Sequence, residues 1–468
     1  MTGGTWMMLS ATTTVATEGT LGLTRRLVSE VGQIASLPLS DRAVQWARHT
    51  VLDWIGVTIS GAQQRSAQIA RAAMLAEGGN PVANAIGSAH RMSARQAALC
   101  GGIASHSQDF DDMGLGGHPS VVVLPAVFAL ADELRTDGTA VLNAILQGFE
   151  AFKIVGAAVG ESSYARGFHC TGTFGAFGAT VAAGCLLNLD AAQMLNALGI
   201  AGTQAAGLRA SFGTMCKHVN AGNAAAIGVL AARLAQGGFT GAHDVLEAPH
   251  GFAHAMNSSP ADLDPGRPRA FLQERLAIEQ NIFKLHAACG GTHSAIEGIR
   301  AIRARHPFSI AEVAGVELFV PALLPGVCGI IGPKTGLQGM FSIHYAVALT
   351  LLGLSTGPEA FTDERVSDPA AIEAQKLVKY TVTDRIAHLA HPTEVAIKLK
   401  SGETLTAAVN IFEPRDNLDA QWADLVVKFR GLVTPVLGEA CAHELVTLIS
   451  RFETLGSIRM LTDRTLTA

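Results

Sequence analysis

Apolar residues recur at helical spacing through the first half of the chain. From Ser40 onward they form one stripe, which consists of Ala43, Val44, Ala47, Val51, Leu52 and Ile55. Ser40 and Asp41 suit the first turn of this helix, because their side-chain oxygens accept hydrogen bonds from free backbone N–H groups. Comparable patterns run through 64–77, 92–107, 119–135, 139–160, 171–187, 190–206 and 220–236. Together they predict an all-helical body.

The pattern changes near residue 280. Segments 312–320 and 379–385 have strand character, and 393–409 predicts a hairpin that turns at Ser401-Gly402. Helical patterns interleave at 292–304, 341–353 and 368–378. After Arg415 the pattern is helical again. We therefore expect a mainly α protein, with a large helical domain from residues 1–280 and 416–468 and a smaller α/β domain from residues 281–415.

The composition is apolar, with 49% hydrophobic and only 16% charged residues, against roughly 25% charged in an average globular chain. Such a chain buries a large core or a subunit interface, so we expect a homodimer. The 50 glycines and 6% aromatic residues indicate closely packed helices. A net charge of −5 does not suggest nucleic acid or an anionic membrane surface as a partner.

Targeting and cofactor motifs are not found. Residues 1–19 have no basic segment followed by an apolar core, and the apolar runs after Ser120 and Thr173 fall short of the roughly 18 residues of a membrane span. The seven cysteines form no C-x-x-C pair, and no Walker A, G-x-S-x-G or H-E-x-x-H motif is present. We expect a cytoplasmic protein with no metal and no organic cofactor.

The segment SHSQDFDDMGLGGHPS holds His106, Asp109, Asp111, Asp112 and His118. Three carboxylates within four residues repel one another unless a metal, a cation or a shared proton offsets them. The glycines that follow let the backbone carry His118 toward a ligand. The alternative is a capped helix end followed by a loop histidine.

Further candidates stand where loops meet helices. His169 precedes a helix that begins near Thr171, and a helix N-terminus favours anions; the alternative is a capping histidine. Lys217 precedes a helix of small residues, where it is either a desolvated base, a cation for the substrate, or a surface lysine. Tyr345 opens an apolar helix and belongs either to the core or to a cleft.

The stretch NIFKLHAACGGTHSA holds Lys284, His286, Cys289 and His293 at the junction of the two predicted domains. Sites favour such junctions. These groups, together with those above, place several cations and protonatable rings in a chain of net charge −5. This separation of charge indicates a pocket for an anionic substrate.

Taken in order, these five stretches resemble the MmgE/PrpD family, which includes 2-methylcitrate dehydratase, cis-aconitate decarboxylase and iminodisuccinate epimerase. LDWIGVTISG at 52–61 resembles an early motif of the family, and the likeness extends from about residue 20 to 430. The resemblance implies a helical domain built from both chain ends, a smaller α/β lid, a homodimer, and an active site in the cleft between the domains.

By motif position, the resemblance places decarboxylase-like active-site residues at Asp109, His118, His169, Lys217, Lys284 and Tyr345. Two positions depart from that pattern. Met113 stands where the pattern has Thr, and Cys289 where it has His, while the glycine-rich loop is one residue shorter. Both substitutions remove a polar group, which favours a substrate with fewer carboxylates.

We therefore expect an enzyme that moves a proton at the carbon next to a carboxylate of a small di- or tricarboxylate. The catalytic candidates are His118, Lys217, Tyr345, His169 and Asp109. The candidates for substrate binding are Lys284, His169, Cys289 and His286. The residues favour an epimerase of the iminodisuccinate type, with a dehydratase or decarboxylase as the alternative lyase. A metal-dependent hydrolase and a non-catalytic helical interaction protein remain as alternatives from other classes.

Overall fold

The computed structural model describes residues 22–36, 39–159, 162–256, 275–386 and 393–467, to which all structural statements refer. It is mainly helical, as predicted. The first 21 residues, on which the expectation about targeting rests, lie outside the described part of the chain.

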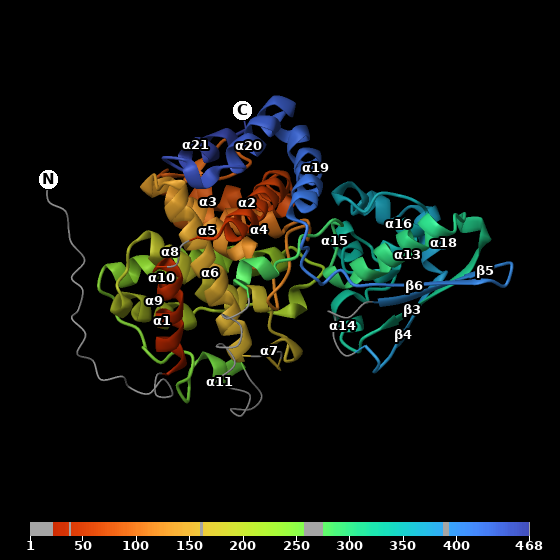
Figure 1. The fold of residues 1–468 in the computed structure, drawn as a ribbon, viewed down its shortest axis with the longest axis horizontal. Helices are drawn as coiled ribbons and strands as arrows, with labels where there is room; N and C mark the ends of the chain where they lie inside the picture. Colours follow the sequence, from red (N-terminus) through yellow and green to blue (C-terminus); the bar gives the residue numbers. More distant parts are fainter. Residues whose placement is uncertain (1–21, 37–38, 160–161, 257–274, 387–392, 468) are drawn as a thin grey trace.

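A body of helices forms the larger part of the molecule (Figure 1). Its helices are α1 (Leu23–Ser36), α2 (Asp41–Gly61), α3 (Arg65–Glu77), α4 (Ala94–His106), α5 (Ser120–Leu134), α6 (Gly138–Val159), α7 (Ser162–Ala165), α8 (Cys170–Leu186), α9 (Ala191–Gly202), α10 (Cys216–Gln236) and α11 (Phe252–Met256). A small ladder joins β1 (Ala83–Asn84) to β2 (Arg91–Met92). Ser40 caps α2 as predicted, because its hydroxyl accepts a hydrogen bond from the Ala43 N–H.

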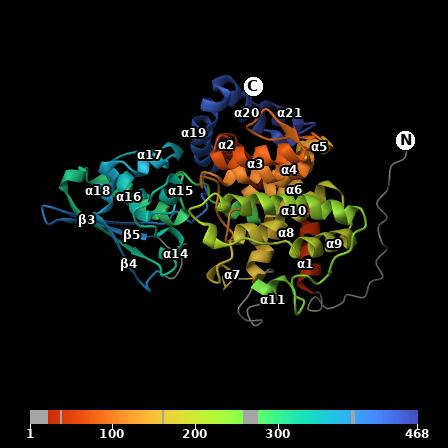
Figure 2. The same ribbon diagram turned by 180° about the vertical axis from the view of Figure 1, so that it is seen from behind.

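Beside this body lies an α/β part, which Figures 1 and 2 show from opposite sides. Its elements are α13 (His293–Arg305), β3 (Val313–Val320), α14 (Pro325–Cys328), α15 (Gly336–Gly339), α16 (Ile343–Leu351), α17 (Asp363–Val366), α18 (Pro369–Gln375), β4 (Val378–Val382), β5 (Thr393–Leu399) and β6 (Thr404–Val409). The sheet order is β4-β3-β5-β6, with β3 parallel to β4 and the other pairs antiparallel. The predicted hairpin is confirmed, and Gly402 supplies a positive φ of 95° at its turn.

The chain returns to the helical body through α19 (Leu418–Leu437), α20 (Glu439–Ile449) and α21 (Arg459–Thr462). Helix α19 packs along α2, so residues 418–437 lie beside residues 41–61. One large core fills the helical body, and a second lies between the sheet and its helices. The division of the chain into two domains at residues 281 and 415 stays a prediction.

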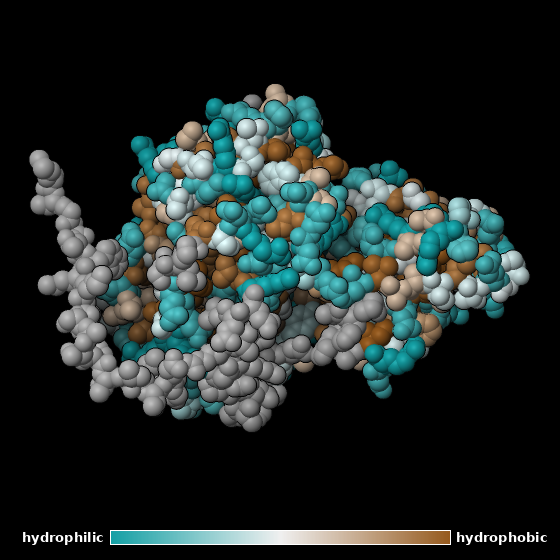
Figure 3. Space-filling view, viewed as in Figure 1, coloured by the Kyte–Doolittle hydropathy of each residue, from teal (hydrophilic) through white to brown (hydrophobic). Residues whose placement is uncertain are grey.

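Helix α6 is long and apolar enough to cross a membrane, alone among the described helices. Its most apolar 18-residue window is 78% buried inside the helical body. On the face drawn in Figure 3, apolar side chains reach the surface over this body and where it meets the α/β part.

Small residues bring the central helices close together. Gly102 of α4 faces Gly222 of α10, and a Cβ added at Gly102 would lie 2.7 Å from the Gly222 Cα atom. Gly148 of α6 and Gly178 of α8 meet in the same way. This packing accounts for the many glycines and few aromatic residues, because a larger side chain would separate the helix axes.

Gly222→Ala is expected to lower the free energy of unfolding by about 1–3 kcal/mol, because the new Cβ would lie 2.4 Å from the Leu99 carbonyl oxygen. Chemical denaturation measures the change. Gly431→Ala in α19 is the matched control: no atom lies within 4 Å of its added Cβ, and a gain of about 0.5–1 kcal/mol is expected. Equal stability of the two variants would contradict the close approach of α4 and α10.

Candidate active site

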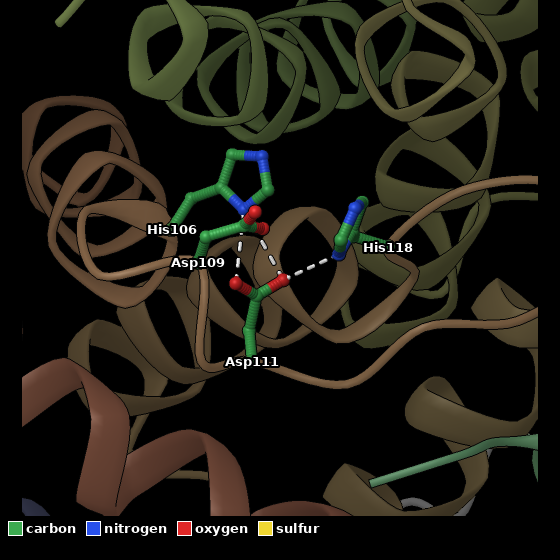
Figure 4. Close-up of side chains that lie close together, drawn as sticks. All are labelled: His106, Asp109, Asp111 and His118. Atoms are coloured by element: carbon green, nitrogen blue, oxygen red, sulfur yellow. Dashed lines mark hydrogen bonds and ion pairs between the residues drawn. The ribbon is translucent and has the colours of Figure 1, made fainter. Parts of the chain in front are cut away.

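The loop between α4 and α5 brings polar side chains into the interior of the molecule. His106 ends α4, and the loop then turns sharply, with positive φ at Asp109 (46°) and at Gly114 and Gly116. A positive φ is uncommon in a residue other than glycine and accompanies functional sites. Figure 4 shows the result: the carboxylates of Asp109 and Asp111 lie with the rings of His106 and His118 in one cluster.

Asp109 binds two lysines from distant parts of the chain. Lys217, at the start of α10, donates to Asp109 Oδ1 over 2.9 Å, and Lys284 donates to the same oxygen over 2.8 Å. All three side chains are almost fully buried. Burial raises the pKa of the Asp109 carboxyl, but the two ammonium groups outweigh it and hold this pKa well below its usual range. The trio carries two positive charges and one negative charge.

Burial lowers the pKa of Lys284, but the carboxylates of Asp109 and Asp111 outweigh it, so that its pKa is raised. Lys284 is therefore a fixed cation and not a neutral base. This state suits the predicted role of Lys284 in binding a substrate carboxylate.

Asp111 lies between two imidazoles. Its carboxylate oxygens are 3.0 and 3.1 Å from Nδ1 of His106 and 2.8 Å from Nδ1 of His118. The His118 Nδ1 atom also lies 2.8 Å from the Asp112 carbonyl. Burial raises the pKa of Asp111, but the two imidazoles hold it well below its usual range. Burial, with Lys217 nearby, lowers the pKa of His106 to about 4, so His106 is neutral at neutral pH.

His169 completes the cluster from the N-terminus of α8. Its ring lies 5.8 Å from that of His106 and 6.4 Å from that of His118, measured between centroids. Asn220 of α10 donates to its Nδ1 over 3.0 Å. His218, the neighbour of Lys217, also lies beside His106 at 6.3 Å. The predicted residues Asp109, His118, His169, Lys217 and Lys284 therefore meet at one place.

Tyr345 does not reach this cluster. Its hydroxyl donates to the Ala360 carbonyl over 2.7 Å, and its ring packs edge-on against Phe361 in the core of the α/β part. Burial raises the pKa of this hydroxyl to about 12. In this structure the apolar helix turns the Tyr345 side chain into the core of the α/β part, and its role in proton transfer stays a prediction.

Both ring nitrogens of His286 have partners in this structure: Nδ1 lies 2.8 Å from the Thr356 hydroxyl, and Nε2 lies 2.8 Å from the Glu297 carboxylate. The role of His286 in substrate binding stays a prediction. Cys289 is buried, and it lies close enough to Asp109 and Lys284 for their charges to shift the pKa of its thiol. Its thiol forms a hydrogen bond with that of Cys328, which lowers the pKa of Cys289.

Sequence reasoning missed Lys428. This residue of α19 donates to Asp53 of α2 over 2.6 Å, and to the carbonyls of Phe110 and Lys284 over 2.6 and 2.9 Å. It thereby ties the Asp109 loop to the segment that carries Lys284. An isolated lysine in an amphipathic helix has no local signal for such a role.

Asp112 is held apart from the other two carboxylates. Ser120 donates to its Oδ1 over 2.7 Å, and Asn281 donates to its Oδ2. Burial raises the pKa of Asp112 to about 7. The repulsion expected among the three carboxylates is thus relieved by cations for Asp109, by imidazoles for Asp111, and by burial among neutral donors for Asp112.

Ligand atoms of His106, Asp109, Asp111 and His118 lie within 4.8 Å of one another, near enough to share one metal ion. The positive charges of the neighbouring lysines disfavour metal binding at this cluster. Lys217 and Lys284 already occupy Asp109 Oδ1, and their ammonium groups would repel a divalent cation in the same space. The arrangement suits an anion.

The family models for the MmgE/PrpD N-terminal and C-terminal domains match residues 25–263 and 286–453. A cis-aconitate decarboxylase of Aspergillus terreus is 26% identical, over 94% of this chain and 95% of its own length. Proteins of the same name from Mus musculus and Homo sapiens are 27% and 26% identical, over 80% and 91% of this chain and 78% and 90% of their own lengths. The family models span most of the sequence, and the chain is therefore an enzyme of the MmgE/PrpD family.

Proposed function

We propose that this protein is a lyase that acts on a small di- or tricarboxylate by moving a proton at the carbon next to a carboxylate. One observation carries the proposal: two buried ammonium groups share a single carboxylate oxygen beside a group of imidazoles. The excess positive charge matches an anionic substrate, and the rings match proton transfer. The named decarboxylases support the lyase class.

The chemistry has one demanding step. Both decarboxylation and dehydration pass through a carbon that holds extra electron density next to a carboxylate. Lys217 and Lys284, fixed in a buried site, stabilise that charge without reorganising. His118 has 16% of its side chain exposed, the largest share in the Asp111 ion pairs, which makes it accessible to the substrate. We assign proton transfer to His118 and Lys217, and carboxylate binding to Lys284 and His169.

An epimerase that acts on a dicarboxylate is the second candidate. Met113 is buried against Gly290, and the neighbouring residue Cys289 lies beside Lys284, so a thiol and not a charged group stands next to this cation. The polar groups that the decarboxylase-like pattern has at positions 113 and 289 are absent here, which favours a substrate with fewer carboxylates. Return of the proton to the opposite face of the same carbon would then give epimerisation.

The test is NMR spectroscopy of the full chain in D2O with a panel of C4–C7 di- and tricarboxylates that includes cis-aconitate. A lyase consumes one member and releases carbon dioxide or water. An epimerase incorporates deuterium at the α carbon and inverts it with no loss of atoms. No change in any member refutes the proposal. Exhaustive chelation is expected to leave the rate unchanged; loss of activity that a divalent metal restores would favour the hydrolase.

We also propose that residues 281–415 act as a lid over the site and that the chain forms a homodimer in the cytoplasm. Exposed apolar side chains support the dimer, among them Ile331 (75% exposed) and Val427 (73% exposed). Light scattering at micromolar concentration is expected to give twice the mass of the chain. A monomeric mass would refute the dimer.

A further inference from the structure

The hydrogen bonds around Asp111 determine where two histidines carry their protons. A carboxylate with a depressed pKa can only accept hydrogen bonds. Nδ1 of His106 and Nδ1 of His118 both point at Asp111, so both Nδ1 atoms carry hydrogen. A neutral imidazole has one hydrogen. His106 is neutral, so its Nε2 atom is left with a lone pair, and the same holds for the neutral form of His118.

His169 has the opposite tautomer. The Ser211 hydroxyl donates to the Leu208 carbonyl, so its oxygen must accept the hydrogen bond from the Asn220 side chain. The nitrogen of this amide therefore faces both Ser211 and His169, and it donates to Nδ1 of His169. Since this Nδ1 atom accepts, the hydrogen of the neutral His169 ring lies on Nε2.

His106 is the central ring of the cluster and has an unused acceptor. Its centroid lies 4.7 Å from that of His118, closer than those of His169 and His218. The side chain is fully buried, and its Nε2 atom has no hydrogen-bond partner among the described residues. An unsatisfied buried acceptor destabilises the protein, and a hydrogen bond from a substrate or a transferred proton would remove that cost.

We propose that His106 is a catalytic acid–base residue, in the role that the sequence suggested for Tyr345, and that Asp111 is the positioning residue for both His106 and His118. This inference rests on the proposed function of the site. It assigns a role to a ring that was not among the catalytic candidates expected from the sequence.

The proton moves without any further reactant. The Nε2 lone pair of one ring takes the proton from the α carbon, and the electrons of the C–H bond pass into the adjacent carboxylate. Asp111 then balances the positive charge of that imidazolium, as an aspartate does in a serine protease. Asp111 carries a single negative charge and can balance only one imidazolium. Either His106 or His118 is therefore cationic at a given time, while the other ring keeps its lone pair. The Nε2–H group of His169 donates to the substrate carboxylate.

Two substitutions test these roles through kinetics. Asp111→Asn replaces an acceptor by an amide, which can donate to Nδ1 and move the imidazole hydrogen to Nε2. In serine proteases the same change keeps the geometry and lowers kcat about 10⁴-fold. We expect Asp111→Asn and His106→Gln each to lower kcat by about 10²–10⁴-fold, with little change in KM and with loss of the acidic limb of the pH profile.

His49→Gln is the matched control. His49 is a buried histidine of α2 whose Nδ1 accepts from Gln421, and it lies outside the cluster. Its loss should affect stability and leave kcat within a few-fold of the unchanged protein. A kcat within tenfold of the unchanged protein in both His106→Gln and Asp111→Asn overturns the proposal.

A second measurement needs no substrate. In protein labelled with ¹⁵N-histidine, NMR spectroscopy distinguishes a ring protonated on Nδ1 from one protonated on Nε2. His106 is assigned by the signal that disappears in His106→Gln or, if that variant does not fold, in His106→Asn. Protonation on Nδ1 supports the inference, and protonation on Nε2 overturns it. If no carboxylate reacts while Nδ1 is protonated, the proposed function fails and the tautomer assignment stands.

Discussion

Lys217→Met is expected to lower kcat by about 10²–10⁴-fold and to change KM far less, and His118→Gln is expected to do the same. This is the loss that follows removal of a general acid or base. The ammonium group of Lys217 is 2.9 Å from Asp109 Oδ1, and its positive charge lowers the pKa of His106. It therefore stands where the reaction would build up negative charge. Steady-state kinetics of the unchanged protein and both variants measure the effect.

Lys153→Met is the control for the loss of a buried lysine. Lys153 is 6% exposed in α6 and donates to the Arg275 carbonyl, away from Asp109. Its replacement should leave kcat nearly unchanged. If Lys217→Met and His118→Gln raise KM while kcat stays normal, the two side chains only bind the substrate equally in ground and transition states, and His106 and His169 become the remaining acid–base candidates.

Asp109→Asn is expected to lower the free energy of unfolding by about 3–5 kcal/mol and to abolish turnover. The substitution leaves two buried ammonium groups without their shared carboxylate, and an uncompensated buried charge is costly. Denaturation and kinetics measure the two effects. Asp132→Asn is the control: Asp132 is 1% exposed and accepts from Arg459, at a distance from the cluster in the fold. The Asp132→Asn variant should be less stable than the unchanged protein but have the same kcat.

The same carboxylate makes stability depend on pH. The pKa of Asp109 is lower in the folded protein than the value of about 3.9 in an unfolded chain, so its contribution is present above that value and is lost as the pH falls below it. The free energy of unfolding should therefore decline below about pH 4, and less steeply in Asp109→Asn. An equal slope in both proteins would mean that the Asp109 pKa is not depressed.

Helices, caps and the hairpin could be predicted from the sequence because their signals are local. The stripe that begins at Ala43, the cap at Ser40 and the turn at Gly402 each depend on residues a few positions apart. The same is true of Asp109, His118, His169 and Lys217, which stand at helix ends or in loops. Such positions can present polar side chains toward a shared interior, so the sequence identified most of the residues that meet in the cluster.

Only the tertiary structure decided the partners of these groups. Tyr345 opens an apolar helix, and this pattern is the same whether the hydroxyl faces a cleft or the Ala360 carbonyl. Lys428 binds Asp53, which lies 375 residues earlier in the chain, and no local pattern links them. The tautomers of His106 and His169 depend on which group reaches each Nδ1 atom, a carboxylate in one ring and an amide in the other. Hydrogen bonds act over about 3 Å in space, and the folded chain alone determines which groups come that close.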